Sequence, residues 1–510
     1  MRRSVGKCAA ALLLPMLLWV SGCATGKWER MRAEQATAFQ EEVNARTEAL
    51  LADGIALDLE RCIDTALRNN LTIKTAEIQQ RIARLERKAA FANFLPQVQL
   101  DVKYVTWDRQ PQSRMMGLLS VPMHDQDMLN AELSVQMPIF VPAAWYLYAM
   151  RRRGEDIGAL VTEHTRRQIV LMTTALYFQC VALDAAIPAL ESQVAAAETL
   201  EREVRLFFDE GLVTAWQAEQ ASASALLRRT ELEKTRRARR QAGADLLAAM
   251  GLSPAAETVL IADTPLEAPD DALEDLIFEA LLRNPRLIIA DRNVTIQKNR
   301  VRLAIAEFLP KLVGILNQSH TSNSFTRYPD ATMLGVAGVM TVFNGLENVR
   351  EYQIARQARE AAYVQREEAC LAIMSGVVRA WLNLQDARDE LALARKAHEV
   401  ESARRVEVEA QWREGLVNAS DRLEAAARCD IAQMRVMQAA FSEQVRIATL
   451  LELLGRPVSN KEPEEAAIGS QDLSAPAPHM ESAPMQQVES ASMSGMESAP
   501  VQHKQEVAGI

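Results

Sequence analysis

The side chain with the most recognisable chemistry in this sequence is the thiol of Cys23. It follows a basic segment and an apolar stretch from Cys8 to Val20, and the small residues Ser21 and Gly22 come directly before it. That stretch has the length of a signal-peptide core and is too short to span a membrane. Two small residues followed by Cys are typical of a bacterial lipoprotein signal, in which a diacylglycerol is attached to the thiol and cleavage occurs just before it. We therefore predict a signal peptide over residues 1–22 and lipidation of Cys23. The alternative is an ordinary secretion signal that happens to contain Cys.

The residue after the cysteine bears on the destination. In lipoproteins that are retained in the inner membrane, an Asp typically follows the lipidated cysteine. In this chain the residue at that position is Ala24. We therefore expect the lipidated chain in the outer membrane of a Gram-negative bacterium, with several acyl chains on one cysteine giving a firm anchor.

Few other residues form a pattern that could carry out a reaction. The chain has six histidines, and two of them, His479 and His503, lie near its C-terminus. No G-x-S-x-G, H-E-x-x-H or P-loop motif occurs, so we predict no enzyme, no catalytic residues, no metal site and no cofactor besides the lipid on Cys23. Methionines gather near histidine within residues 115–128 and again in the tail, and thioether sulfur suits Cu(I). Methionines in a loop and a low-complexity tail, with no ligand role, are the alternative.

Charge and cysteine content exclude other classes of protein. Removing the leader takes three of the 57 basic residues and none of the 67 acidic ones, which leaves a net charge of −13. Such a charge argues against nucleic acid as a partner. The remaining cysteines are far apart, so we expect free, half-buried thiols, with two disulfides as the alternative; they are Cys62, Cys180, Cys370 and Cys429. No later stretch reaches 18 consecutive apolar residues, so no transmembrane helix is predicted.

The chain repeats itself at a long interval. Four short landmarks return in the same order, at offsets of 215, 214, 204 and 204 residues. They are Arg-Asn at 68–69 and 283–284, Phe-Leu-Pro at 94–96 and 308–310, Glu-Gly-Leu-Val at 210–213 and 414–417, and an apolar run ending in Gly251 and in Gly455. An offset near 200 indicates a duplicated half, because short structural repeats return every 20–50 residues, roughly.

Each half has the same predicted order of elements. The opening helices are expected over 57–93 and 272–307, each ended by the Phe-Leu-Pro segment. Strands with one apolar face are expected over about 97–109 and 129–140, and weaker ones over about 311–322 and 333–343. Long helices are expected over 155–207 and 347–411, and they return over 216–250 and 419–454 after tips near 211 and 415. Their length requires partner helices throughout, as in coiled coils.

These elements predict a mainly α protein with membrane β-strands. Four strands cannot close a barrel, and an open sheet edge is not tolerated in lipid. The strands must therefore come from several chains, and a closed ring would have eight strands in a dimer or twelve in a trimer. The sequence does not choose between them.

The ordered, duplicated landmarks over residues 55–457 resemble the TolC-like outer-membrane factors, in particular their lipidated efflux branch. The resemblance implies a homotrimer, with a twelve-stranded barrel in the outer membrane continued by a long periplasmic α-helical barrel. It also implies a periplasmic adaptor (membrane fusion protein) and an inner-membrane transporter as partners, and no nucleic acid. The predicted function is then an exit duct of a tripartite efflux or secretion system.

The same resemblance suggests site residues. Loops 110–128 and 323–332 would face the exterior, and the hairpin tips would dock the adaptor; the tip residues are Gly211, Leu212, Val213, Gly415, Leu416 and Val417. Asp421 and Glu424 would form a periplasmic pore constriction, although Gln217 stands at the matching acidic position of the first half. Val417 stands where some members have a basic latch residue. The alternative is that Asp421 caps a helix and Glu424 is solvated.

The predicted domain organisation follows from these elements. It comprises the signal peptide (1–22), an N-terminal lipid-anchored segment (23–54), a first repeat (55–271), a second repeat (272–457) and a disordered low-complexity tail (458–510). Two other functions remain open. A coiled-coil structural lipoprotein would need the helices but not the strands, and a pump adaptor would carry one hairpin flanked by β-rich domains.

Overall fold

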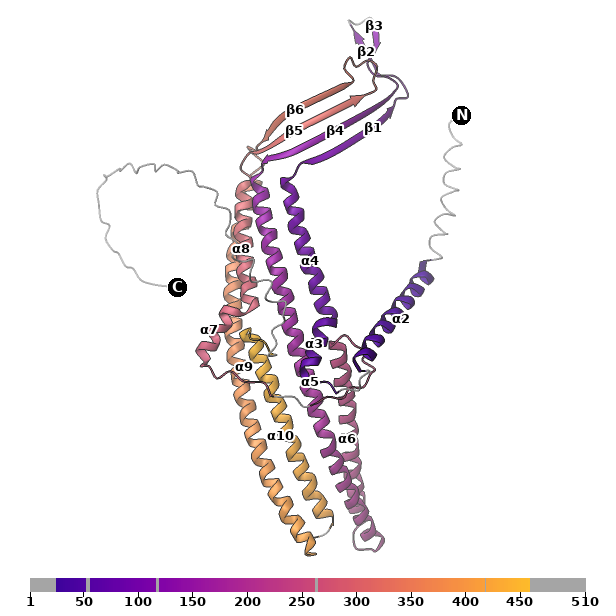
Figure 1. The fold of residues 1–510 in the computed structure, drawn as a ribbon, viewed down its shortest axis with the longest axis vertical. Coiled ribbons are helices and arrows are strands. Elements are labelled where there is room, and N and C mark those ends of the chain that lie inside the picture. Colours follow the sequence, from indigo (N-terminus) through magenta and orange to yellow (C-terminus); the bar gives the residue numbers. More distant parts are fainter. Residues whose placement is uncertain (1–23, 52–55, 116–118, 262–264, 418, 459–510) are drawn as a thin grey trace, which may run out of the picture. The chain divides into compact units, whose positions relative to one another are not determined.

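The chain is described by a computed structural model, which describes residues 24–458 apart from 52–55, 116–118, 262–264 and 418 (Figure 1). Cys23, the signal peptide and the tail therefore lie outside the described residues. The helices are α2 (Ala24–Leu51), α3 (Leu59–Asn69), α4 (Leu71–Phe91), η1 (Ala92–Phe94), α5 (Pro142–Asp209), α6 (Ala215–Ala249), α7 (Leu273–Arg283), α8 (Pro285–Ala306), α9 (Glu347–Arg413) and α10 (Ala419–Leu454). The strands are β1 (Gln97–Thr106), β2 (Gln112–Met115), β3 (Leu119–Pro122), β4 (Asp127–Phe140), β5 (Lys311–Thr321) and β6 (Asp330–Val339).

The duplication is visible in the order of the elements. The first half runs from two short helices through β1 and β4 to the hairpin of α5 and α6, and the second half repeats this from α7 to α10. The long helices α5 and α9 have 68 and 67 residues. Helix α9 agrees with the expected 347–411, whereas α5 begins at Pro142, 13 residues before the expected start at 155. Pro188 lies inside α5 without ending it.

The opening helix of each half is not continuous, and here the prediction of single helices over 57–93 and 272–307 was wrong. The first breaks between α3 and α4 at Asn70, and the second between α7 and α8 at Asn284. Both asparagines have an extended backbone and accept backbone N–H groups from the first turn of the following helix. This is N-capping, for which Asn is among the preferred residues.

Each of these asparagines also ties the break to the returning helix. The Asn70 amide donates to the carbonyl of Ala249, at the end of α6, over 2.7 Å. The Asn284 amide donates to the carbonyl of Leu453, at the end of α10, over 3.0 Å. Both side chains are buried, at 6% and 3% exposure, so each break is a fixed feature of its repeat.

The four-stranded sheet is antiparallel, with the order β1-β4-β5-β6. Its open edges are β1, from the first half, and β6, from the second. On β1 the apolar side chains project from one face and are largely exposed; these are Val98, Leu100, Val102 and Tyr104. The expected strand over 333–343 begins earlier and ends at Val339, because Val339 already pairs with Lys311, the first residue of β5.

A second sheet lies within the segment expected to be a loop. Strands β2 and β3 form a two-stranded antiparallel hairpin between β1 and β4, so the prediction of an irregular loop over 110–128 was incomplete. Nearby, Asn323 links this segment to the loop between β5 and β6, since its side chain accepts the N–H of Asp125 at 3.1 Å.

Two buried clusters form the cores of the two halves. The first surrounds Tyr177 and Leu246, and the second surrounds Leu384 and Leu450. The rings of Phe178 and Phe441 stack at a centroid distance of 5.9 Å and join the halves. The four described cysteines are free, and burial raises the pKa of Cys62 to about 12 and of Cys180 to about 11.

The helices pack side by side in two rows, and the outermost helices of each row form the two margins of the chain. Nearer the sheet, α4, α5, α8 and α9 pack in that order, and beyond the asparagine breaks the order is α6, α5, α10 and α9 (Figure 1). One margin is thus formed by α4 and α6, and the other by α9. Among the described helices, α5 is the one long and apolar enough to cross a membrane, but 44% of its most apolar window is buried, and core helices pass the same test.

Candidate functional site: the two hairpin tips

The first hairpin tip is built by a glycine and a helix cap. At the end of α5, Gly211 adopts a left-handed φ of +74°, which glycine reaches without steric cost. The N–H of Leu212 bonds the carbonyl of Phe207 at 2.8 Å, which closes the helix end. Thr214 then caps α6, in a capping box with Gln217.

The second tip repeats this geometry. Gly415 also has a φ of +74°, and the N–H of Leu416 bonds the carbonyl of Gln411 at 2.9 Å. The two leucines are exposed to the same extent, 68% for Leu212 and 69% for Leu416, whereas Val213 and Val417 are half-buried. Both tips therefore present an apolar side chain on a turn of fixed shape.

The tips differ in the surface around that leucine. The first carries further exposed large apolar side chains from the end of α5 and the start of α6, namely Leu206, Phe207, Phe208 and Trp216. Both tips have a glutamate at the C-cap, Glu210 and Glu414. At the positions of the four apolar residues the second tip has Ala410, Gln411, Trp412 and Ser420. The first tip is thus the more apolar of the two.

The two proposed constriction acids lie at the start of α10. Asp421 is in the first turn, in the position that Gln217 holds in the first hairpin, and a carboxylate there interacts favourably with the helix N-terminus. Glu424 is one turn further along, with a side chain 56% exposed, and it forms an ion pair with Arg428 of the same helix. The structure brings the two acids onto the same short segment next to the tip.

Sequence reasoning missed Arg422, which lies between these acids in the chain. Its Nε donates to Glu409 at 2.7 Å, and its guanidinium carbon lies 4.0 Å from the ring centroid of Trp412, a cation–π geometry. The signal was available, because an antiparallel hairpin brings together residues equally distant from its turn. These contacts, the Arg422 clamp, join α9 to α10. They also pair Arg422, the cationic residue between the two acids in the sequence, with residues of α9.

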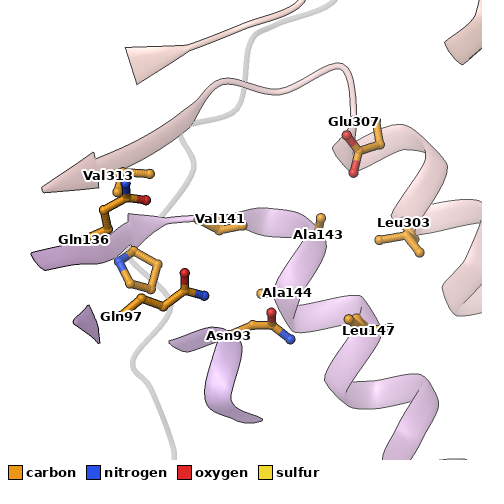
Figure 2. Close-up of a pocket in the computed structure, with 11 residues that line it drawn as sticks. Asn93, Gln97, Gln136, Val141, Ala143, Ala144, Leu147, Leu303, Glu307 and Val313 are labelled. Carbon is orange, nitrogen blue, oxygen red and sulfur yellow. The ribbon is translucent and has the colours of Figure 1, made fainter. Parts of the chain in front are cut away.

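A recess of about 450 Å³ lies where the sheet meets the helices (Figure 2). Gln97 and Gln136, paired across β1 and β4, point towards it, as does Asn93 from η1. Leu147 of α5 and Leu303 of α8 close its helical side. Its walls mix amides and apolar side chains with the carboxylate of Glu307, which is paired with Lys311, and we assign it no ligand.

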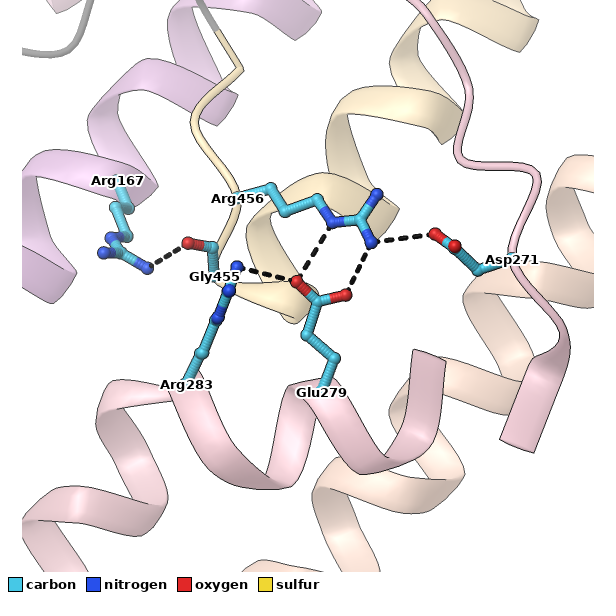
Figure 3. Close-up of polar contacts among 6 residues, drawn as sticks. All are labelled: Arg167, Asp271, Glu279, Arg283, Gly455 and Arg456. Carbon is cyan, nitrogen blue, oxygen red and sulfur yellow. Dashed lines mark hydrogen bonds and ion pairs between the residues drawn. The ribbon is translucent and has the colours of Figure 1, made fainter. Parts of the chain in front are cut away.

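An ion-pair network lies at the far end of α10, beside the asparagine break of the second half (Figure 3). Arg456 contacts both carboxylate oxygens of Glu279, at 3.1 and 2.6 Å, and also reaches Asp271 at 2.8 Å. Arg283 contacts Glu279 at 2.8 Å, and Arg167 of α5 donates to the carbonyl of Gly455 at 3.1 Å. The hydrogen bond from Arg456 lowers the pKa of Glu279.

Within the part of the chain that the structure describes, no group of three or more His, Cys, Asp or Glu side chains is placed to hold a metal ion. The methionine-rich tail and residues 116–118 lie outside that part, whereas Met123 and His124 lie within it, and the ring of His124 contacts the amide of Asn323 at 3.1 Å.

The chain belongs to the outer membrane efflux protein family. The family model matches residues 62–252 and again residues 276–456, one match for each half of the duplication. The members of this family are channel proteins, so the chain is a channel protein of the outer membrane and not an enzyme. No curated protein sequence gives a significant match.

Solved structures of outer-membrane channels share this fold. The CmeC channel of Campylobacter jejuni is 16% identical, with a TM-score of 0.69 over 80% of this chain and 88% of that one. VceC of Vibrio cholerae is 15% identical, with a TM-score of 0.64 over 79% and 97%. The open state of MtrE of Neisseria gonorrhoeae is 16% identical, with a TM-score of 0.63 over 78% and 89%. The TolC-like fold predicted from the landmarks is confirmed.

Proposed function

We propose that three copies of this chain form the outer-membrane exit duct of a tripartite efflux system. The observation that carries the proposal is that the sheet and both helix rows have their unpaired edges on the same two sides of the chain. The sheet is open at β1 and β6, and the helix rows end at α4 and α6 on one side and at α9 on the other. One head-to-tail contact, repeated around an axis, would close all layers together.

The sheet must be closed if it lies in lipid, because its edge N–H and C=O groups would otherwise remain unsatisfied. Three copies of four strands give twelve, the number that the family resemblance implies. The exposed apolar face of β1 would contact lipid, and Gln97 and Gln99, which alternate with it, would face the duct.

The exposed side chains of the marginal helices support a head-to-tail contact. On α4 one stripe contains Leu71, Ile78, Ile82 and Leu85, all at least 42% exposed. On α9 another stripe contains Val364, Leu371, Leu382 and Leu393, all at least 50% exposed. The α4 residues are spaced by 7, 4 and 3 positions, and the α9 residues by 7, 11 and 11. These spacings place each set on one face of its helix. At the level of α4 the α9 stripe contributes Val364 and Leu371, and burying these against the α4 stripe would remove both from water. Leu382 and Leu393 lie beyond the break, at the level of α6.

The duplication supports the same contact. At the offset of 204, Leu382 of α9 corresponds to Phe178 of α5, which is 2% exposed and stacks on Phe441 of α10. The first half thus buries Phe178 against the second half, whereas the equivalent residue of the second half, Leu382, is 50% exposed. A neighbouring copy would supply the missing contact.

The tips define the periplasmic end of the proposed duct. The exposed leucines of both turns, with the aromatic side chains of the first, would dock a periplasmic adaptor that leads to an inner-membrane transporter. Asp421 and Glu424 would form an acidic constriction, which favours cations. Cys23 would be lipidated and would help to deliver the chain to the outer membrane. The proposal assigns no cargo.

The test combines mass and conductance. Cross-linked protein extracted from outer membranes is expected to have the mass of a trimer and to form cation-selective pores in planar bilayers. The double variant Asp421→Asn, Glu424→Gln is expected to lower the cation preference, whereas Glu233→Gln, about 27 Å from the first turn at 1.5 Å per residue, is expected to leave it unchanged. A monomer, or a trimer without conductance, would refute the duct and favour a structural lipoprotein.

A further inference from the structure

Helix α2, which precedes the first repeat, carries a sparse row of apolar side chains on one side. Trp28, Phe39, Val43 and Leu50 are separated by 11, 4 and 7 residues, which places them on one side of a helix. Glu34, Glu41 and Glu48 follow one another at seven residues on the opposite side. Arg32 and Arg46 interrupt the apolar side, and Arg46 is paired with Glu42.

This apolar side is buried at one end and exposed at the other. Val43 is 8% exposed, and Thr47, one turn later, is 4% exposed and accepts the backbone N–H of Ser253 at 2.9 Å. Towards the N-terminus, Phe39 is 51% exposed and Trp28 is 58% exposed. The side of α2 that is used for packing at Val43 therefore carries two exposed aromatic side chains further towards the N-terminus, with Arg32 and Gln35 between them.

The length of α2 matches the distance from its fixed end to the sheet. Ser253 follows Gly251, which packs against Asn69 at the break before α4. From that level, α4 and η1 rise by about 36 Å to the first strand, and α2 extends about 35 Å from Thr47 back to Ala24. An α2 that runs alongside α4 would thus bring Cys23, the proposed lipidation site, to the level where the strands begin.

The fixed end of α2 lies at a margin of the subunit. Ser253 comes directly after α6, and α6 forms a margin of its helix row. The duplication indicates what lies beyond. The segment that precedes the second repeat pairs with the first repeat at Leu57 and Val259, at 2.9 Å, and reaches the second at Leu266 and Gln444. This segment therefore bridges the first and second repeats of one chain. Helix α2 holds the equivalent place before the first repeat. In a ring, the repeat that adjoins the first repeat on that side is the second repeat of another copy.

Helix α9 of another copy offers a matching surface at that margin. Ile373 of α9 packs in one cluster with Leu454, which precedes Gly455, the counterpart of Gly251. Ile373 therefore marks the level of Thr47. Trp28 lies 19 residues before Thr47, and Ile354 lies 19 residues before Ile373.

The face of α9 that contains Ile354 is free to receive a helix. Ile354, Ala361, Gln365 and Ala372 are all exposed and are spaced by 7, 4 and 7 residues. Two of them are alanines, which allow a second helix to approach closely. This face lies about 90° around α9 from the stripe of Val364, Leu371 and Leu382, which the ring contact would use, and about 90° from the buried face of Ala355 and Ile373.

We propose that α2 is an intersubunit strap, which lies lengthwise on α9 of the neighbouring copy and buries Trp28 near the neighbour's Ile354. The strap rests on the ring oligomer of the proposed function. It would cover the outer side of the seam between subunits and couple the lipid anchor of one subunit to the packing of the next.

The test places a photoreactive benzoylphenylalanine at Trp28 or Phe39, with Glu34 and Glu41 on the opposite face as matched control positions. Two differently tagged full-length copies are expressed together, and the native mass of the extracted oligomer is measured before irradiation. The expected result is a covalent link between differently tagged chains, mapped by mass spectrometry to residues 347–373. The control positions are expected to give at least fivefold less of this product.

The outcomes separate the strap from the ring. A trimer in which Trp28 and Phe39 link only within their own chain, to lipid or to another protein would overturn the strap and leave the ring intact. Equal linking from Glu34 and Glu41 would also overturn the strap. A monomer before irradiation would overturn both proposals. The double variant Trp28→Ala, Phe39→Ala is expected to lower the dissociation temperature of the trimer, and Glu34→Ala, Glu41→Ala is expected to leave it unchanged.

Discussion

Single asparagines determine where the helices of each half are interrupted. The side chains of Asn70 and Asn284 each cap one helix and bond the end of another, so one buried amide joins two elements at the point where a third helix ends. Replacing either one with Ala would leave a buried carbonyl and N-terminal N–H groups without these partners. The sequence marked Asn284, and Asn69 beside Asn70, as landmarks of the duplication, but the bonds to the returning helices span 179 and 169 residues and leave no local signal.

The pairing of Glu279 with Arg456 gives a prediction about pH. The pKa of Glu279 is lowered in the folded chain by its bond to Arg456, so the carboxylate contributes stability above the unfolded pKa, and this contribution is lost as pH falls through the folded value. Glu279→Gln is expected to lower the free energy of unfolding by about 2 kcal/mol at pH 7, a magnitude usual for hydrogen bonds to charged groups. Thermal unfolding measured from pH 7 to pH 3 checks this.

The difference between Glu279→Gln and the parent chain is expected to shrink below about pH 4.5, the ordinary pKa range of Glu. Glu399, which pairs with Lys396 on an exposed surface, provides a control. Glu399→Gln should change stability little at any pH, because exposed ion pairs contribute little. A Glu279→Gln deficit that stays constant down to pH 3 would contradict the proposed linkage.

At the scale of elements, periodic and local signals were sufficient where they existed. The Glu-Gly-Leu-Val turns, the long helices and the strands β1 and β4 follow from the positions of glycine, from the absence of helix breakers and from alternation. The β2–β3 hairpin could not be predicted in this way, since it depends on which segments meet after folding. The Arg422 clamp could be found only by pairing residues across the turn at Gly415, a step that the sequence reasoning did not take. The constriction acids remain a proposal, because their role depends on copies of the chain around an axis.

Four glycines at the C-terminal ends of helices have a left-handed backbone, and replacing them with alanine is expected to have two kinds of effect. Gly415 has no atom within 4 Å of the position of an added Cβ, so Gly415→Ala meets backbone strain alone, about 1–2 kcal/mol. At Gly251 the added Cβ would lie 2.7 Å from the carbonyl oxygen of Asn69, so the backbone must also move. Gly251→Ala is therefore expected to cost about 3 kcal/mol or more.

Thermal unfolding followed by circular dichroism is expected to rank the parent chain above Gly415→Ala, and Gly415→Ala above Gly251→Ala. Gly211, which is equally open, serves as a replicate of Gly415. If Gly251→Ala were no less stable than Gly415→Ala, the close approach of Gly251 to Asn69 would not constrain the fold.

At the scale of the whole molecule, the duplication explains why one chain can build three layers with common margins. Each half contributes two strands to the four-stranded sheet and four α-helices to the rows, and the halves join through α5 against α8 and α10. The sequence predicted the duplication, because its landmarks keep their order and offset. It could not reveal which helices end the rows, since that depends on long-range packing and not on periodicity.

The exposed face of the sheet gives a prediction about membrane insertion. Val102 lies near the middle of β1, is 58% exposed and belongs to the apolar row proposed to contact lipid. Val102→Arg is expected to cost about 2–4 kcal/mol, the penalty for a basic side chain at the bilayer midplane of a membrane sheet. Gln99→Arg, on the same strand but the opposite face, is expected to cost little, because that side chain would remain in water. The amount of folded protein in the outer-membrane fraction measures both. Equal loss from the two variants would mean that the sheet does not divide lipid from water, and a normal yield of Val102→Arg would place this face outside the membrane.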